Sequence, residues 1–292
     1  MIVEDHKCAV TGANGYLGSK IARALTQRGW EVHKLVRRTE SDSDQFSARF
    51  TLDQGAPAGF FRDRGIDVLI HCAYDFRPTR WPEILETNVL GSVRLMKAAK
   101  AENVRQIVFI STVSAFEGCK SLYGKAKLEI EREALKLGAV VIRPGLIYGD
   151  QPGAMMGALA KAVKRSSIVP IIGNGQQLLY LVHEDDLISL ILKLCTEEEG
   201  STGSPIVAAS SEGRTFREIL MALASRQQKR IRFLPVPWRL CWAALKAVEV
   251  FGLKPGFRSD SIVSLVNTDP DLQTLTRQTR FPFRKFDVAT LG

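Results

Sequence analysis

The stretch Val10-Thr11-Gly12-Ala13-Asn14-Gly15-Tyr16-Leu17-Gly18 decides the fold of this chain of 292 residues. It joins a short apolar run to an amphipathic segment, as the turn between a buried strand and a helix does. Gly12 permits a tight turn, Gly15 lets the backbone approach a pyrophosphate, and Gly18 lets the helix pack close to the sheet. The helix N-terminus offers N–H groups and a positive dipole end to phosphates. The sequence therefore predicts a dinucleotide-binding turn made by Thr11, Gly12, Asn14, Gly15, Tyr16, Leu17 and Gly18, with GxxGxxG spacing in place of the common GxGxxG.

Apolar runs alternate with amphipathic segments through the first half of the chain. The predicted strands are Cys8–Val10, Glu31–Val36, Phe50–Leu52, Asp67–Ala73, Gln106–Ser111 and Ala139–Arg143, and the predicted helices are Gly15–Arg28, Pro82–Glu102 and Tyr123–Leu137. This alternation predicts βαβ units and a parallel sheet. The second half is less regular, with helices expected at Met155–Arg165, His183–Cys195, Phe216–Ser225 and Trp238–Gly252 and a strand at Pro205–Ala209.

The expected architecture is α/β: a Rossmann-type doubly wound parallel sheet with a smaller, discontinuous C-terminal substrate lobe. Residues 1–150, with a contribution from about 181–211, are expected to form the dinucleotide-binding domain. Residues 151–180 and 212–292 are expected to form the substrate-binding lobe.

Composition bounds the class of protein. Hydrophobic residues make up 45% and charged residues 24% of the chain, as in an ordinary soluble globular protein. The five cysteines, Cys8, Cys72, Cys119, Cys195 and Cys241, show neither CxxC nor metal-ligand spacing, so we expect no disulfide framework and no metal site. The net charge of +9 is spread without a basic run, which argues against nucleic acid and favours anionic ligands. The N-terminus has no signal-peptide pattern, so we expect a cytoplasmic protein.

The end of the second predicted strand bears on cofactor preference. An acidic residue about twenty positions after the turn would hold the ribose 2′-hydroxyl of NAD, but Arg37 and Arg38 stand here. A guanidinium suits a 2′-phosphate because it forms two charge-assisted hydrogen bonds. The pattern favours NADP(H) over NAD(H), with solvated strand-end charges as the alternative. Asp53 is either an acceptor for the adenine amino group or a surface turn residue.

A proton-transfer pair follows the fifth predicted strand. Tyr123 and Lys127 are four residues apart, so they share one face of a helix. A tyrosine with a pKa near 10 is a poor acid or base at neutral pH unless a nearby cation stabilises its phenolate, and Lys127 supplies that charge. Lys127 could also hold the nicotinamide ribose. Thr112 could donate a hydrogen bond to a developing alkoxide.

In their order and spacing these motifs resemble the short-chain dehydrogenases/reductases, specifically their extended, epimerase/dehydratase-like branch. The matching pieces are Thr11–Gly18, Asp53, His71–Ala73, Asn88, Ser111–Thr112, Tyr123 with Lys127, Arg143–Gly149 and Val182–Leu187. The resemblance implies that Thr112, Tyr123 and Lys127 form a catalytic triad, that Asn88 braces the active site, and that Ala73, Ser111 and Pro144 line the cofactor cleft. It also implies a homodimer formed through the helices around Asn88 and Tyr123.

The substrate side is less sharply defined. Pro170–Gln177 resembles the loop that nucleotide-sugar epimerases and reductases place over the sugar diphosphate, and we predict Ser114, Tyr148, Asn174 and Arg258 as substrate residues. The family usually carries a diphosphate-binding arginine where Leu179 stands. Arg258 either replaces it or is a solvated surface residue.

Three functions remain open. The leading hypothesis is an NADP-dependent reductase or epimerase of a 4-keto nucleotide-activated sugar, with Tyr123 as acid/base. The second is an NADPH-dependent reductase of a small hydrophobic ketone or aldehyde, which Leu178 and Leu179 favour. The third is a non-catalytic NADP-binding sensor or assembly subunit.

Other conspicuous residues have plainer interpretations. We expect His71 to serve packing or a local hydrogen bond, and His183 to lie in a helix cap. The stripe of Trp238, Trp242, Leu245 and Phe251 is interpreted as lobe core, with a membrane-surface helix as the alternative.

Overall fold

The computed structural model of the chain describes residues 6–39, 45–151, 153–196, 203–251 and 257–290. The backbone divides into two compact units, each discontinuous in sequence. The first unit consists of residues 1–112, 126–143 and 188–206, and the second of residues 113–125, 144–187 and 207–292.

A seven-stranded sheet with the order β10-β6-β5-β4-β1-β2-β3 dominates the first unit. Its strands are β1 (Lys7–Thr11), β2 (Glu31–Val36), β3 (Ser47–Arg49), β4 (Val68–His71), β5 (Gln106–Ile110), β6 (Val140–Pro144) and β10 (Ile206–Ala208). All pairings from β3 to β6 are parallel. The order reverses at β1, which lies between β2 and β4, and this is the switch point where doubly wound sheets bind ligands. The predicted Rossmann-type sheet is confirmed.

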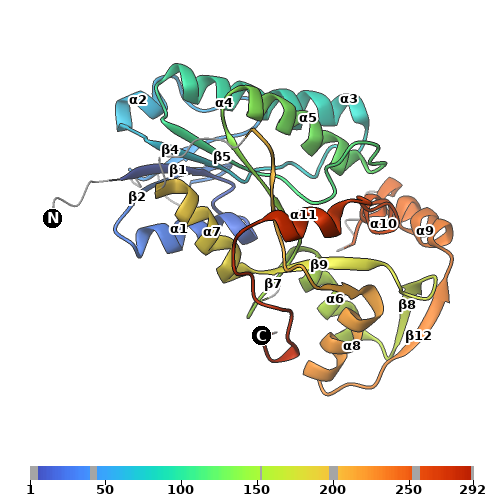
Figure 1. Ribbon diagram of the computed structural model, residues 1–292. Coiled ribbons are helices and arrows are strands. Elements are labelled where there is room, and N and C mark those ends of the chain that lie inside the picture. Colours follow the sequence, from blue (N-terminus) through green and yellow to red (C-terminus); the bar gives the residue numbers. More distant parts are fainter. Residues whose placement is uncertain (1–5, 40–44, 152, 197–202, 252–256, 291–292) are drawn as a thin grey trace. The chain divides into compact units, whose positions relative to one another are not determined.

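Helices cover both faces of this sheet. Figure 1 shows α2, α4 and α5 on one face and α1 and α7 on the other. The helices are α1 (Tyr16–Thr26), α2 (Phe60–Arg64), α3 (Trp81–Ile84), α4 (Gly91–Ala101), α5 (Leu122–Lys136) and α7 (Glu184–Thr196). Because both faces are covered, every residue of β4 and β5 is buried, which explains their continuous apolar runs.

Two predicted elements of the first unit are corrected. The third strand is Ser47–Arg49 and not Phe50–Leu52, because the chain turns back after Phe50 and Thr51 pairs with Gly55. The single helix predicted over Pro82–Glu102 is α3 and α4 joined by a π-helical segment, Leu85–Leu90. A single π-helical turn inside an α-helix is too short to produce a sequence period of its own, so the sequence does not reveal it.

The second unit is built on two small sheets, β11-β9-β7 and β12-β8. Its elements are β7 (Leu146–Tyr148), β8 (Ile168–Ile172), β9 (Leu178–His183), β11 (Gly213–Thr215), β12 (Arg232–Val236), α6 (Ala154–Arg165), α8 (Phe216–Arg226), α9 (Trp238–Val250), α10 (Ser259–Val266), α11 (Leu272–Gln278) and the 3-10 turn Val288–Thr290. Residues from β8, β9, α6, α8 and α10 form one hydrophobic core. The predicted end of the α9 helix, Gly252, lies outside the described residues.

No helix among the described residues is long and apolar enough to cross a bilayer.

Candidate active site

The glycine turn after β1 has the geometry that a dinucleotide pyrophosphate requires. Gly12 has a φ of +67°, in the left-handed region, and a Cβ there would lie 3.1 Å from the Ala73 backbone nitrogen. A Cβ at Gly18 would lie 2.3 Å from the Gly12 carbonyl oxygen, and one at Gly15 would lie 3.0 Å from the same oxygen. Side chains at these positions would fill the space between the turn and the helix, so the residues present fit the cofactor.

The N-terminus of α1 presents an uncharged surface to that space. Its N-cap is Gly15, which makes no side-chain cap hydrogen bond, and the first turn from Tyr16 to Ser19 carries no acidic residue. Asn14 and Gly15 are exposed. The positive end of the helix dipole is therefore available to an anion.

A buried hydrogen-bond chain fixes the turn to β4. The Thr11 hydroxyl accepts hydrogen bonds from the backbone N–H groups of Cys72 and Ala73, both at 3.1 Å, and lies 2.7 Å from His71 Nδ1. With both lone pairs used, that hydroxyl donates to Nδ1. The ring is then the neutral Nε2–H tautomer, which donates to the Ser92 hydroxyl at 2.8 Å. Burial lowers the pKa of His71 to about 3, in agreement with a neutral ring. The expectation of a local hydrogen bond for His71 is confirmed.

Charged residues gather where the strands β2 and β4 end. Arg37 and Arg38 are exposed after β2, and Asp53 is exposed in the turn after β3. The Asp75 carboxylate, beyond β4, accepts hydrogen bonds from Arg77 Nε and Nη2 at 2.8 and 2.5 Å. Burial works to raise the pKa of Asp75, but the hydrogen bonds from Arg77 outweigh it and hold the pKa below its usual value, with help from the Arg37 charge. The sequence gives no sign of Arg77, because it belongs to no motif.

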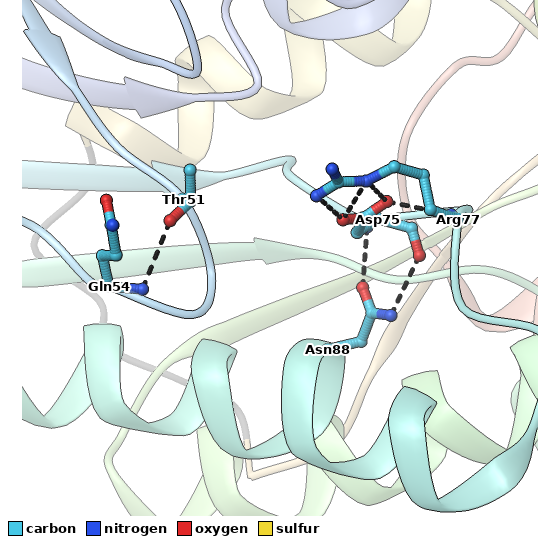
Figure 2. A network of polar contacts seen from close by, with 5 residues as sticks. All are labelled: Thr51, Gln54, Asp75, Arg77 and Asn88. Carbon is cyan, nitrogen blue, oxygen red and sulfur yellow. Dashed lines mark hydrogen bonds and ion pairs between the residues drawn. The ribbon is translucent and has the colours of Figure 1, made fainter.

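Asn88 holds the loop that carries this ion pair. Its side chain is fully buried on the π-helical segment, where its Oδ1 accepts from the Asp75 N–H at 2.7 Å and its Nδ2 donates to the Asp75 carbonyl at 3.0 Å. Figure 2 shows Asn88 reaching the loop below the Asp75–Arg77 pair, and the separate Gln54–Thr51 bond that closes the turn containing Asp53. The bracing interaction of Asn88 is with backbone, and any effect on catalysis stays a prediction.

Lys127 is a buried ammonium group on α5. Its side chain is 2% exposed, and Nζ donates to the Ile110 carbonyl at 2.7 Å and lies 4.6 Å from the centroid of the Phe109 ring. Since Ile110 ends β5, this bond fixes Lys127 at the same strand end as Ser111, which is buried, and Thr112.

Two opposing effects set the protonation of Lys127. Burial lowers the pKa of its ammonium to about 8, while negative charge at Cys72 and Glu131 would raise it. Burial also raises the pKa of the Cys72 thiol to about 12, so Cys72 stays neutral and Glu131 supplies the opposing charge. Glu131 is itself buried and paired with Arg143 at 2.6 Å. No motif marks this pair in the sequence, since its members are separated by 12 residues and both belong to regular elements.

Tyr123 lies in the first turn of α5, within the second unit. The Asp260 carboxylate of α10 accepts hydrogen bonds from the Leu122 and Tyr123 N–H groups, both at 2.9 Å. A Cβ on Gly124 would lie 2.2 Å from the Ser114 carbonyl oxygen, so the helix start packs directly against that segment. Burial raises the pKa of the Tyr123 phenol, although part of the side chain remains exposed.

The other predicted substrate residues of the second unit occupy different environments. Tyr148 is fully buried in the core, with its hydroxyl donating to the Lys285 carbonyl at 3.3 Å and its ring against Phe286. Asn174 is exposed in the turn after β8, where its Oδ1 accepts from the Gln176 N–H at 3.2 Å. Pro144, which was predicted to line the cofactor cleft, ends β6, and its carbonyl accepts from the Val113 N–H at 3.1 Å. Tyr148 is therefore a core residue and Asn174 an exposed turn residue, and the structure does not bring these two predicted substrate residues together.

In the segment around Arg258, predicted to bind the substrate, Asp260 is the residue that makes structural contacts. Arg258 is the N-cap of α10 and is half-buried. Two residues on, Asp260 makes the bonds to the start of α5 described above. His183 follows its own expectation: its Nδ1 accepts from the Asp185 N–H at 3.2 Å in the first turn of α7, as a helix-cap residue does.

The sequence profile of the NAD-dependent epimerase/dehydratase family matches residues 8–209, well over half of the chain. The chain belongs to the NAD-dependent epimerase/dehydratase family. The resemblance to the extended short-chain dehydrogenases/reductases is therefore confirmed, and the chain is an NAD(P)-dependent enzyme.

Relatives within and around the epimerase/dehydratase family differ in their reactions. Ceramide reductase from Caulobacter vibrioides is 27% identical over 241 residues, which cover 78% of this chain and 73% of that protein. UDP-glucose 4-epimerase from Vibrio cholerae is 24% identical over 287 residues, 89% of this chain and 85% of that protein. The solved UDP-glucose 4-epimerase of Thermus thermophilus in complex with NAD shares the fold, with a TM-score of 0.64, 22% identity, and coverage of 93% of this chain and 99% of that one.

Proposed function

We propose that the enzyme transfers hydride between NADP(H) and the C4 carbonyl of a nucleotide-activated sugar, with Tyr123 as the acid/base. The observation that carries this proposal is the buried ammonium group of Lys127, which donates a hydrogen bond to the Ile110 carbonyl. Lys127 lies on α5, the helix that bears Tyr123 one turn earlier. A buried cation has little use in a merely structural helix, because removing it from water is unfavourable.

The chemistry follows from these groups. The turn Gly12–Gly18 and Arg37 would hold NADPH, which when bound would supply the hydride for the carbonyl carbon. Tyr123 gives its phenolic proton to the carbonyl oxygen, and the Lys127 charge stabilises the phenolate that remains. Thr112 donates a hydrogen bond to the developing alkoxide. The negative charge of Glu131 partly opposes the lowering of the Lys127 pKa by burial.

Exposed arginines at the end of β2 support NADP(H) over NAD(H). Arg37 and Arg38 stand where an NAD-specific enzyme has a carboxylate, and a 2′-phosphate would accept from them. We expect Arg37→Ala with Arg38→Ala to raise the Kd for NADPH by about 10- to 100-fold and to leave that for NADH within about threefold. Arg28→Ala, an exposed arginine at the end of α1, is the control. Equal losses for both cofactors would contradict the preference.

The nucleotide-sugar substrate is supported by the relative UDP-glucose 4-epimerase, which covers 89% of this chain. One observation favours a second candidate, a reductase of a hydrophobic ketone. Leu179, at the position expected to hold a diphosphate-binding arginine, packs against the lobe core from β9, and Leu178 beside it is exposed. The relative ceramide reductase agrees with a lipid-like ketone.

NADPH oxidation with two substrates decides between these candidates. A dTDP-4-keto-6-deoxysugar is expected to be turned over, and a long-chain keto amide is the comparison; the reverse order would favour the second candidate. In either case Tyr123→Phe should reduce kcat by at least about 10³-fold with NADPH affinity unchanged, because general acid catalysis and the phenolate charge are both lost. If Tyr123→Phe retains turnover, the proposed acid/base role is wrong.

A further inference from the structure

The outward side of helix α9 is apolar where a soluble helix carries charge. Leu240 is 61% exposed and Phe251, just past the helix end, is 83% exposed. Ala244 and Ala247 between them are also exposed. These positions are spaced by four, three and four residues, so they form one row along the helix. We call Leu240, Ala244, Ala247 and Phe251 the outer row of α9.

The opposite side of α9 is firmly attached to the second unit. Cys241 and Leu245 pack against its hydrophobic core. The Glu249 carboxylate accepts hydrogen bonds from the Ser259 N–H at 2.8 Å and the Ser259 hydroxyl at 2.7 Å, which tie α9 to α10. Figure 1 shows these two helices side by side. The helix therefore cannot turn its outer row inward without breaking these contacts.

All charged residues from 227 to the end of the outer row at 251 are basic except Glu249. The basic residues are Lys229, Arg230, Arg232, Arg239 and Lys246. Three of these cations have partners: Lys229 Nζ donates to the Lys164 carbonyl at 2.7 Å, Lys246 lies 4.0 Å from Glu249, and the Arg239 guanidinium lies 5.7 Å from the centroid of the Trp238 ring. Arg230, Arg232 and Arg239 are exposed.

Two tryptophans of α9 are partly exposed on the side of the helix away from the outer row. Trp238 is 39% exposed and Trp242 is 38% exposed. Long basic side chains near an apolar helix face can extend to lipid phosphates.

We infer that α9 lies in the surface of an anionic bilayer, with its outer row in the apolar boundary and Arg230, Arg232 and Arg239 at the phosphates. This inference goes beyond the proposed function and does not depend on it. The charge favours an anionic lipid surface over a second copy of the chain, because two copies of net charge +9 would both bring positive charge to the contact. No described helix is long and apolar enough to span a bilayer, and the proposed contact is that of a helix lying in the plane of the membrane surface.

Co-sedimentation with vesicles tests this inference. The full chain is mixed with vesicles of phosphatidylcholine alone or of phosphatidylcholine with an equal share of phosphatidylglycerol, at low and high salt. We expect at least tenfold stronger partitioning to the anionic vesicles, and weaker partitioning as salt rises. Leu240→Asp with Ala247→Asp should lower the partitioning by at least tenfold, and so should Arg230→Gln with Arg232→Gln and Arg239→Gln.

Matched controls come from exposed positions elsewhere in the second unit. Met221→Asp on α8 removes an exposed apolar side chain, and Lys161→Gln on α6 removes an exposed cation. Both should bind vesicles like the parent protein. All variants should keep the melting temperature and the affinity for NADPH, since the altered side chains are exposed. The inference is overturned if the parent protein ignores anionic vesicles, if the outer-row variant binds as well as the controls, or if sedimentation shows a dimer that the outer-row variant dissociates.

Discussion

The N-termini of helices α1 and α5 are treated in opposite ways. α1 begins at Tyr16 after a glycine N-cap, with no acidic residue in its first turn and no side chain of the described residues capping it. α5 begins at Leu122, and its first N–H groups donate to the Asp260 carboxylate, which comes from a helix 138 residues further on. Both ends carry the positive pole of a helix dipole, but a carboxylate of the protein occupies the end of α5, whereas no described side chain caps the end of α1.

The difference teaches how to distinguish a binding end from a structural one. At α1, glycines let the turn and the helix start pack closely, since a Cβ at Gly18 would lie 2.3 Å from the Gly12 carbonyl oxygen, and no described side chain caps the helix. At α5, an internal carboxylate satisfies the backbone donors and so fixes the turn that carries Tyr123. The N-terminus of α1 thus suits reversible binding of a phosphate. The N-terminus of α5 suits a fixed position for the Tyr123 side chain.

Placing a charge at the α1 end should produce the largest effect. Gly15 has extended backbone angles that any residue can adopt, and its Cβ would lie 3.0 Å from the Gly12 carbonyl oxygen. Gly15→Ala therefore tests the space alone, and Gly15→Asp adds a negative charge in the same place. We expect the Kd for NADPH, measured by fluorescence titration, to be about 100-fold higher for Gly15→Asp than for Gly15→Ala, equivalent to about 2.7 kcal/mol. If both variants bind NADPH equally, the end is not where the phosphates rest.

The contrast also shows what the sequence can predict. The glycines that shape the start of α1 lie within nine consecutive residues, Val10–Gly18. Three glycines at this spacing after a strand are typical of a phosphate-binding turn, so the sequence predicts the turn together with its residues. It cannot predict the Asp260 contact, because that contact depends on how a distant helix packs. The sequence also cannot predict the position of the Asp75–Arg77 pair, because that loop is fixed by a hydrogen bond from the Asp75 N–H to the side chain of Asn88, 13 residues further on.

The sequence signal for strands is strong where burial is complete and weak elsewhere. β4 and β5 are buried at every position, and their apolar runs predict them. β8 alternates between exposed and buried residues and contains Pro170, so its sequence is easily interpreted as part of a loop over a diphosphate. Its pairing with β12 is parallel and 64 residues away, so neither a tight turn nor a hairpin signal marks it in the sequence.

The two helices should also respond differently to pH. Backbone N–H groups do not titrate, so the affinity for NADPH should stay constant between about pH 7 and 9. The Lys127 pKa is lowered by burial to about 8, so its ammonium is charged below that pH and neutral above it. Because the charged form stabilises the Tyr123 phenolate, kcat at saturating NADPH should fall about tenfold per pH unit above about 8.

Lys127→Arg is the control for this pH dependence. An arginine keeps its charge throughout, so the residual kcat of this variant should be flat where that of the parent protein falls. A parent profile that stays level between about pH 7 and 10 would show that Lys127 does not act through its charge.

Removing the carboxylate at α5 should have the smallest effect of the three. Asp260→Ala leaves the Leu122 and Tyr123 N–H groups without their acceptor, as loss of a helix cap does, so the free energy of unfolding should fall by about 1–2 kcal/mol. Asp260→Asn keeps an acceptor oxygen without the charge and should fall between Ala and the parent. Since the first turn of α5 loosens, kcat should drop several-fold while the Kd for NADPH, set at α1, stays unchanged.

Asp271→Asn, an exposed aspartate that makes no cap bond at the start of α11, is the matched control. A loss of cofactor affinity in Asp260→Ala, or unchanged kcat and unfolding, would mean that the two helix ends are not separate in function.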